Sequence, residues 1–563
     1  MILLPRLLVS MAAAACVILP PLTFAQQDKT VPATTDSKNG PIVKAPAGAV
    51  EGQMDGDLRV FKGIPYALPP VGSQRWRPPV PMPRWAGIRK ATEFGPICFQ
   101  PVSPVPSIYS WTPAPMSEDC LTLNIWAPTG ARKAPVFFWI HGGALTTGSS
   151  RDALYDGAKL AEQGIIVVSL NFRLGVLGWL AHPELSKESP NGVSGNYALL
   201  DLIEGLKWVK QNIGSFGGDP SNVTIAGESS GGLSVMYLMA SPPARGLFAK
   251  AIAESAYMIT TPELKKAAFG LPSAEDSGVK LAAALHAPDI AAMRAMDAAT
   301  LSVAAPKAGY GPWGSIDGYL LTRQLVDVFD KGEQAPVPLL AGFNSGEIRS
   351  LRMLAPRPPA TQADYEKVIH DRYLDLADEF LQLHPGSQME ESILATTRDA
   401  LYGWTAVRLV KKQAAKGQPS FLYFFDHGYP AEDAAGLHGF HASELPYVFG
   451  TSDGTPSLWP KIPNTDEEKK LSDAMIGYWT SFARSGRPTA KDEPAWPAYG
   501  STGAYMEITD APLPSTGLLP GMYELNEEVV CRRRASGDES WNWNVGVVSP
   551  ILPPQQPQCK QTE

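Results

Sequence analysis

Residues 221–240 read S-N-V-T-I-A-G-E-S-S-G-G-L-S-V-M-Y-L-M-A, and this stretch decides the fold of the 563-residue chain. Residues 223–226 predict a short buried strand, and the apolar run 232–240 predicts the start of a helix. The glycine-rich turn between them holds Ser229. A sharp strand-to-helix turn exposes a serine hydroxyl beside the positive end of the helix dipole, so the pattern indicates a nucleophilic serine.

The pentapeptide G-x-S-x-G occurs twice in the chain. The second copy, around Ser452, is followed by two prolines that forbid the helix such a turn requires, so we reject Ser452 as the nucleophile. Around Ser229, the flanking Gly227 and Gly231 leave the room that a close strand-helix joint needs. The alternative for Ser229 is a buried glycine-rich joint without chemistry.

The surrounding pattern predicts an α/β fold with a mostly parallel central sheet covered by helices on both faces. Residues 134–140, 164–170 and 250–255 are apolar runs typical of buried strands. Residues 198–213 place their apolar side chains on one helical face, just before the strand that leads to the serine. This alternation of strand and helix is typical of a parallel sheet.

The strand at 134–140 runs into the glycine-rich stretch H-G-G-A. A serine that attacks a carbonyl creates an oxyanion, which needs N–H donors from such a loop and from the residue after the serine. We expect the backbone N–H groups of Gly143, Ala144 and Ser230 to form this oxyanion hole. The alternative is a plain turn between strand and loop.

The serine also needs a histidine as base and an acidic residue that orients it, in the chain order serine, acid, histidine. Glu347 stands at the loop end of a buried strand, and Asp317 is the alternative acid. His441 precedes an apolar stretch, and His438 is the alternative base. The residues alone favour Glu347 over Asp317 by no more than about two to one.

Composition is that of an ordinary globular chain, with 44% hydrophobic and 18% charged residues and a formal net charge of −8. This acidic balance argues against nucleic acid or an anionic membrane as a partner. Arg6 and the apolar run after it predict a signal peptide cleaved after Ala25, with a lipobox at Cys16 as the alternative. No later stretch has 18 consecutive apolar residues, so we expect a secreted or periplasmic protein without a membrane span.

Four cysteines follow the signal peptide and form two close pairs. In an exported protein they suggest the disulfides Cys98–Cys120 and Cys531–Cys559, with four buried thiols as the alternative. The basic run 532–534 is expected to be a solvated patch of the tail. The predicted organisation is a signal peptide at 1–25, a flexible leader at 26–46, a catalytic domain at 47–525 and a C-terminal extension at 526–563.

The chain resembles the type B carboxylesterases, the group of α/β-hydrolases that includes cholinesterases and bacterial para-nitrobenzyl esterases. The resemblance spans about residues 47–499 and implies the α/β-hydrolase fold. It is carried by motifs in order along the chain, which are F-K-G-I-P-Y-A from Phe61, E-D-C-L-T-L-N-I-W-A-P from Glu118, H-G-G from His141, N-F-R-L-G from Asn171, F-G-G-D-P-S-N-V-T-I-A-G-E-S-S-G-G from Phe216, G-F-N-S-G-E from Gly342 and H-A-S-E-L-P-Y-V-F-G from His441.

This resemblance implies that Ser229 is the nucleophile, Glu347 the acid and His441 the base, and it decides against Asp317 and His438. It implies hydrolysis of a small-molecule carboxylic ester through an acyl-enzyme, without a metal or an organic cofactor. Two other classes use or retain such a site. One is an amidase or thioesterase with the same triad, and the other is a non-catalytic cholinesterase-like binding protein.

The resemblance also assigns supporting residues. It implies oxyanion donors at Gly143, Ala144 and the Ser230 amide, and it supports Cys98–Cys120 as the first disulfide loop. It suggests Ser255 as a hydroxyl near the triad and Glu228 as a buried glutamate that needs a cationic or hydrogen-bonding partner. Ala144 stands where most relatives have a third glycine. Ser230 replaces a common alanine, and we expect little change from it because the donor is the backbone.

Overall fold

A computed structural model describes residues 40–103, 105–110 and 112–559. The predicted signal peptide, its cleavage after Ala25 and residues 26–39 of the predicted leader lie outside these residues. Strand β1 covers Ile42–Ala45 and pairs with β2 (Gly48–Glu51) as an antiparallel hairpin. The ordered chain therefore starts before residue 46, where the leader was predicted to end.

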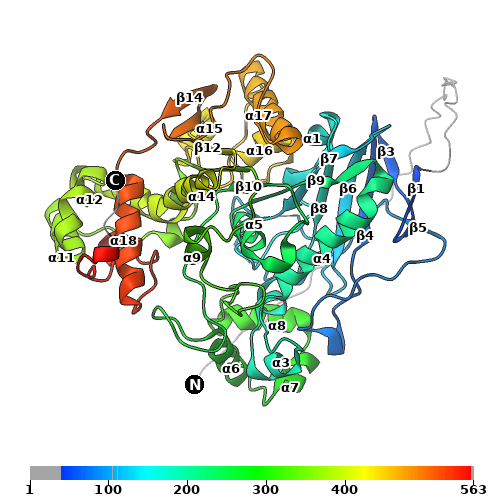
Figure 1. The fold of residues 1–563 in the computed structure, drawn as a ribbon, viewed down its shortest axis with the longest axis horizontal. Helices are drawn as coiled ribbons and strands as arrows, with labels where there is room; N and C mark the ends of the chain where they lie inside the picture. Colours follow the sequence, from blue (N-terminus) through cyan, green and yellow to red (C-terminus); the bar gives the residue numbers. More distant parts are fainter. Residues whose placement is uncertain (1–39, 104, 111, 560–563) are drawn as a thin grey trace, which may run out of the picture. The chain divides into compact units, whose positions relative to one another are not determined.

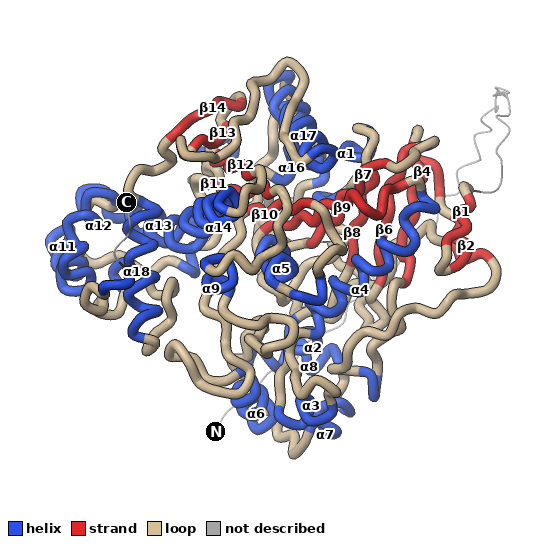
Figure 2. Tube along the Cα trace, viewed as in Figure 1, coloured by secondary structure: helices blue, strands red, loops and turns tan. Residues whose placement is uncertain are grey.

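One large sheet organises the described residues, in the strand order β14-β13-β12-β11-β10-β9-β7-β8-β6-β4-β3. The pairings from β8 through β13 are parallel and the outer ones are antiparallel, which confirms a mostly parallel centre. Figure 2 shows these strands between layers of helix. Besides β1 and β2, the strands are β3 Gln53–Asp55, β4 Leu58–Pro65, β5 Ile88–Lys90, β6 Thr122–Pro128, β7 Ala134–Ile140, β8 Ile166–Leu170, β9 Gly218–Glu228, β10 Lys250–Glu254, β11 Leu339–Asn344, β12 Ser420–Phe425, β13 Ala504–Ile508 and β14 Pro512–Thr516.

Strand β7 shows why helices cover both faces of this sheet. Val136, Phe138 and Ile140 point into one core, which α4 and α5 close. Phe137 and Trp139 point into a second core, which α17 closes from the other side (Figure 1). Alternate residues of a strand face opposite sides, so a continuous apolar run needs cover on both.

None of the described helices combines the length and the apolar content that a bilayer crossing requires. The helices are α1 Ala158–Glu162, α2 Gly175–Trp179, α3 Pro183–Glu188, α4 Tyr197–Asn212, α5 Ser230–Ala240, α6 Ala274–Ala284, α7 Ile290–Ala295, α8 Ala298–Lys307, α9 Leu325–Asp330, α10 Glu347–Ser350, α11 Gln362–Tyr373, α12 Ala377–Leu383, α13 Met389–Arg398, α14 Trp404–Ala415, α15 Pro430–Ala434, α16 Leu445–Phe449, α17 Asp466–Ser485 and α18 Met522–Ser536.

The prediction of a solvated arginine patch in the tail is wrong. Arg532 and Arg533 lie on α18 and are each only 1% exposed. Arg532 pairs with Asp375 at 2.7 Å and with Glu528 at 2.6 Å, so its charge is balanced by two carboxylates. Helix α18 runs across residue 525, where the catalytic domain was predicted to end. The predicted C-terminal extension therefore packs together with that domain.

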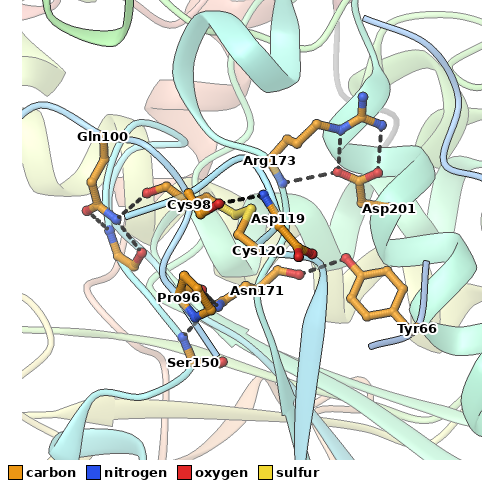
Figure 3. Close-up of a disulfide and its surroundings, with 12 residues drawn as sticks. Tyr66, Pro96, Cys98, Gln100, Asp119, Cys120, Ser150, Asn171, Arg173 and Asp201 are labelled. Carbon is orange, nitrogen blue, oxygen red and sulfur yellow. Dashed lines mark hydrogen bonds and ion pairs between the residues drawn. A yellow bond between two sulfur atoms is a disulfide. The ribbon is translucent and has the colours of Figure 1, made fainter. Parts of the chain in front are cut away.

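Both predicted disulfides are present in the structure. The Cα atoms are 5.1 Å apart in Cys98–Cys120 and 5.6 Å apart in Cys531–Cys559. Figure 3 shows the first bridge among the loops that follow the strands of the sheet. Each bridge closes a loop of about thirty residues or fewer, for which the usual stabilisation is about 3 kcal/mol.

A buried ion pair lies close to the first disulfide (Figure 3). Arg173, in the loop after β8, binds Asp201 of α4 through two guanidinium nitrogens, at 2.8 Å and 2.7 Å. Asp201 is fully buried, and this burial raises the pKa of its carboxyl despite the neighbouring guanidinium. A charged side chain buried away from water destabilises the fold unless an oppositely charged partner compensates it.

We predict that Arg173→Ala lowers the free energy of unfolding by about 3–5 kcal/mol, because it leaves the Asp201 carboxylate buried without its cation. Equilibrium unfolding in urea, followed by tryptophan fluorescence, measures the change. Arg77→Ala is the matched control, since Arg77 pairs with Glu188 at the surface, where ion pairs contribute less than about 1 kcal/mol. Equal losses in the two variants would contradict the prediction.

Candidate active site

Ser229 is the only residue between strand β9, which ends at Glu228, and helix α5, which begins at Ser230. Its backbone has φ 57° and ψ −122°, a left-handed conformation that a side chain rarely adopts. Its N–H donates to the carbonyl of Glu254 at 3.0 Å, which anchors the turn to β10. The side chain is half-buried, and within the described residues its hydroxyl has no hydrogen-bond partner.

Two glycines make this turn possible, as the sequence predicted. A Cβ on Gly231 would lie 2.1 Å from the carbonyl oxygen of Ile140, and one on Gly227 would lie 2.6 Å from the carbonyl carbon of Gly231. Strand β7 and the start of α5 therefore approach too closely for any larger residue. The second pentapeptide differs, because Ser452 lies exposed in a short 3-10 turn.

His441 and Glu347 lie together in the structure. The Nδ1 atom of His441 contacts Oε2 of Glu347, and the other oxygen of Glu347 accepts the backbone N–H of Asn344 at 2.8 Å. Both side chains are buried. Since both carboxylate oxygens are bound, the glutamate is held rigidly beneath the imidazole.

The loop that carries His441 is held against the end of β11. The Asn344 side chain donates to the carbonyl of Phe440 at 2.9 Å and to Glu444 at 2.5 Å. The N–H of Gly346 donates to the carbonyl of Gly439 at 2.8 Å. These bonds fix the histidine loop relative to the strand end that carries the glutamate.

The alternative acid and base have other partners. His438 is half-exposed and contacts Asp433 at 2.6 Å and Asp426 at 3.2 Å. One Asp317 oxygen accepts the side-chain amide of Asn196 at 2.9 Å, and the other accepts three backbone N–H groups of its own turn. Asp317 therefore stabilises a turn.

Glu228 supplies the second contact of the imidazole. Oε1 of Glu228 lies 3.0 Å from Nε2 of His441, so the histidine is the partner that the buried glutamate was expected to need. Among the described residues, no hydrogen bond joins His441 to Ser229. Ser229 directly follows Glu228, and a Cβ placed on Gly142 would lie 3.2 Å from Ser229 Cβ and 2.8 Å from Glu228 Oε2, so the glycine-rich loop contacts the serine turn.

These contacts and the burial of the site shift the pKa values of the histidine and of the nearby glutamates. Burial alone would lower the pKa of His441, but the carboxylates of Glu228 and Glu347 outweigh it and hold that pKa well above its ordinary value. Burial raises the pKa of Glu228 and, to about 8, that of Glu254. Burial and the neighbouring carboxylates likewise raise the pKa of Glu444. Several buried carboxyl groups thus lie near one buried imidazole.

The expected oxyanion loop has two free donors. Within the described residues, the backbone N–H groups of Gly143 and Ala144 have no acceptor. The loop is tied to α5 by a contact that the sequence analysis missed, since the N–H of Leu145 donates to Oγ of Ser230 at 3.1 Å. The serine at position 230, expected to change little, joins the loop to the turn of Ser229.

Ser255 lies at the end of β10, next to the residue that receives the N–H of Ser229. It is fully buried, and its hydroxyl has no partner among the described residues. Ser255 also has a positive φ, and non-glycine residues with such strained backbone cluster at functional sites. The loops that meet here contain several such non-glycine residues, with positive φ at Ala144, Leu145, Ser229, Ser255 and Ala442.

Two aromatic residues at the site were missed from the sequence. The Tyr109 hydroxyl donates to the carbonyl of His441 at 2.8 Å, and Tyr109 belongs to the loop that Cys98–Cys120 closes. The Tyr402 ring lies 5.3 Å from the His441 ring. Neither tyrosine belongs to a motif, and only the disulfide indicated that the loop of Tyr109 is held in place.

Comparison with known proteins identifies the family of the chain. The model of the family described as "Carboxylesterase family" matches residues 39–519. The chain is 36% identical over 523 residues to the fumonisin B1 esterase of Sphingopyxis macrogoltabida, covering 89% of this chain and 92% of that protein. It is 36% identical over 467 residues to the para-nitrobenzyl esterase of Bacillus subtilis (strain 168), covering 81% and 92%.

A solved structure of a PNB esterase superposes with a TM-score of 0.75 at 32% identity, over 86% of this chain and 99% of that one. The likeness extends over nearly the whole of that enzyme, so the α/β-hydrolase fold expected from the motifs is confirmed. The chain belongs to the type B carboxylesterase family, and it is a carboxylesterase.

Proposed function

We propose that Ser229, His441 and Glu347 are the catalytic triad of this carboxylesterase. The observation that carries the proposal is the contact between His441 Nδ1 and Glu347 Oε2, in a loop held beside the strained turn of Ser229. In this chemistry the acid fixes the imidazole and stabilises its cation, which leaves Nε2 to exchange protons with the serine.

In the proposed reaction, Nε2 of His441 takes the proton of Ser229 as the hydroxyl attacks the ester carbonyl. The N–H groups of Gly143, Ala144 and Ser230 bind the oxyanion, and each such donor contributes on the order of 3 kcal/mol to the transition state. The alcohol leaves with the proton from His441. Water then attacks the acyl-enzyme by the same route and releases the acid.

In this scheme, Glu228 affects the pH at which His441 can act as a base. It contacts the same nitrogen that must accept the serine proton. At low pH the imidazole is protonated and paired with Glu228, and it cannot act as a base. Activity therefore rises as the pH rises through the elevated pKa of His441.

We propose that the protein works in the periplasm or outside the cell. Two disulfides support this location, because such bonds persist in oxidising compartments. An amidase or thioesterase with the same triad is the nearest alternative, and rates on matched ester, thioester and amide substrates separate these activities.

The first prediction tests the nucleophile. Ser229→Ala should lower kcat on 4-nitrophenyl acetate by roughly 10⁴-fold or more, since loss of a triad serine removes the attacking group. Ser452→Ala is the matched control, in the second G-x-S-x-G, and should keep the parental rate. A fluorophosphonate probe should label the parent and the control, and a parent that resists labelling would point to a binding protein.

The second prediction tests the charge beside the imidazole. Glu228→Gln removes a negative charge that favours the imidazolium, so it should lower the pKa of His441 and move the acid limb of the kcat/KM profile to lower pH. Asp433→Asn, which alters the partner of His438, should leave that limb in place. An unmoved limb in Glu228→Gln would refute the assignment of His441.

The third prediction concerns export. Intact mass measurement of protein recovered from the periplasm or medium, without reductant, should show a chain that begins at Gln26 and carries both disulfides. Reduction should then raise the mass by four hydrogens, two for each bridge. A chain that retains residues 1–25, or one with four free thiols, would contradict the proposed location.

A further inference from the structure

A cavity of about 800 Å³ is lined by residues in and around α6 and α8 and by residues of the tail after α18. Figure 1 shows where these helices lie. Ile259, Phe269 and Trp313 belong to its first wall. The second wall is the strap, defined here as residues 537–550, which contributes Trp543. The volume is within the range of pockets that bind small molecules, about 300–1,000 Å³.

The strap is held by buried polar contacts. Arg533, only 1% exposed, donates to the carbonyl of Trp543 at 2.8 Å and to that of Asn544 at 3.1 Å. The N–H of Trp541 donates to Oγ1 of Thr260 at 3.0 Å, which joins the strap to the first wall. A wall fixed at both sides keeps the cavity open without a ligand.

Three hydroxyl groups of the cavity wall already donate to acceptors of the protein. Ser540 donates to Thr260 at 2.9 Å, Ser277 donates to the carbonyl of Ser273 at 3.0 Å, and Tyr310 donates to the carbonyl of Trp179 at 2.9 Å. Trp313 and Trp543 are each 39% exposed, which is unusual for such large apolar side chains. The wall thus offers ring faces to a ligand.

The charges around the cavity do not select an ionic ligand. Lys280 and Arg372 are balanced in number by Asp538 and Glu539. Within the described residues, none of these four forms a recorded ion pair. Two cations beside two anions leave no net attraction for a carboxylate or an ammonium group. The net charge of the lining therefore favours neither an anion nor a cation, and the exposed aromatic rings are what the wall offers to an apolar group.

The cavity begins close to the serine. From Ser255, beside Ser229, the chain runs to Ile259 in the cavity wall, and four residues span at most about 14 Å. Between them, the Tyr257 ring packs 6.0 Å from that of Tyr402, the ring beside His441. An extended chain covers about 3.5 Å for every three bonds, so about ten to twelve bonds bridge this distance.

We propose that this cavity is a subsite for a long or bulky uncharged apolar group of the ester, and that the strap helps to set substrate preference. The inference rests on the proposed function, because it needs the ester carbonyl at Ser229. The strap lies beyond residue 519, where the match to the family model ends. The strap's share of the preference is accordingly carried by residues outside that match, whereas the opposite wall lies inside it.

The test measures kcat/KM on two pairs of esters. 4-Nitrophenyl acetate and decanoate differ in the acyl group, and ethyl and decyl acetate differ in the alcohol. Trp543→Ala, in the strap, and Trp313→Ala, in the opposite wall, should each lower the value for the long member of at least one pair by about tenfold. The short member of that pair should stay within about twofold of the parent.

Ile551→Ala is the matched control, since Ile551 follows the strap, is 63% exposed and does not line the cavity. It should leave the ratio of long to short substrate unchanged. Equal effects of the tryptophan variants on long and short esters, or no effect on either, would overturn the subsite. The absence of any hydrolysis by the parent would instead refute the proposed function, so the two failures are distinguishable.

Discussion

The close approach of β7, β9 and the first turn of α5 is the constraint on which the site depends. Because Gly227 and Gly231 carry no side chain, Ile140 can contact the start of α5, and Ser229 is left in a left-handed conformation on top of the joint. Strained backbone of this kind costs about 1–3 kcal/mol and persists only where neighbouring structure enforces it. Here the enforcing structure is the parallel sheet, which anchors the serine N–H to β10.

A second constraint is electrostatic. Glu228, Glu347 and Glu444 lie buried near His441, and burial together with repulsion from neighbouring carboxylates raises the pKa of Glu228 and of Glu444. The imidazole is the cation that compensates part of this charge. The same pairing that stabilises the buried acids therefore also determines at which pH the histidine is free to act as a base.

Much of this architecture could be predicted from the sequence because local patterns encode it. The apolar run 134–140 coincides with β7, and the amphipathic run 198–213 differs from α4 by one residue at each end. The acid and the base could not be chosen on spacing, since Asp317 and His438 were also plausible in the chain order. They were chosen by resemblance, and in the structure the two alternatives have partners of their own, which are Asn196 for Asp317 and Asp433 for His438.

Long-range contacts account for what the sequence could not indicate. Arg532 and Arg533 form part of a basic run typical of a surface, and only the fold supplies the carboxylates and carbonyls that bury them. Ser230 was expected to change little because its backbone is the donor, and the sequence could not indicate its side-chain contact with Leu145, 85 positions away.

The loop between Cys98 and Cys120 has a practical consequence. It carries Tyr109, whose hydroxyl holds the carbonyl of His441, so the covalent bridge is mechanically connected to the base. A recombinant host that makes the chain in its reducing cytoplasm would leave this loop untethered and the imidazole less well held. The choice of expression compartment will therefore affect specific activity as well as yield.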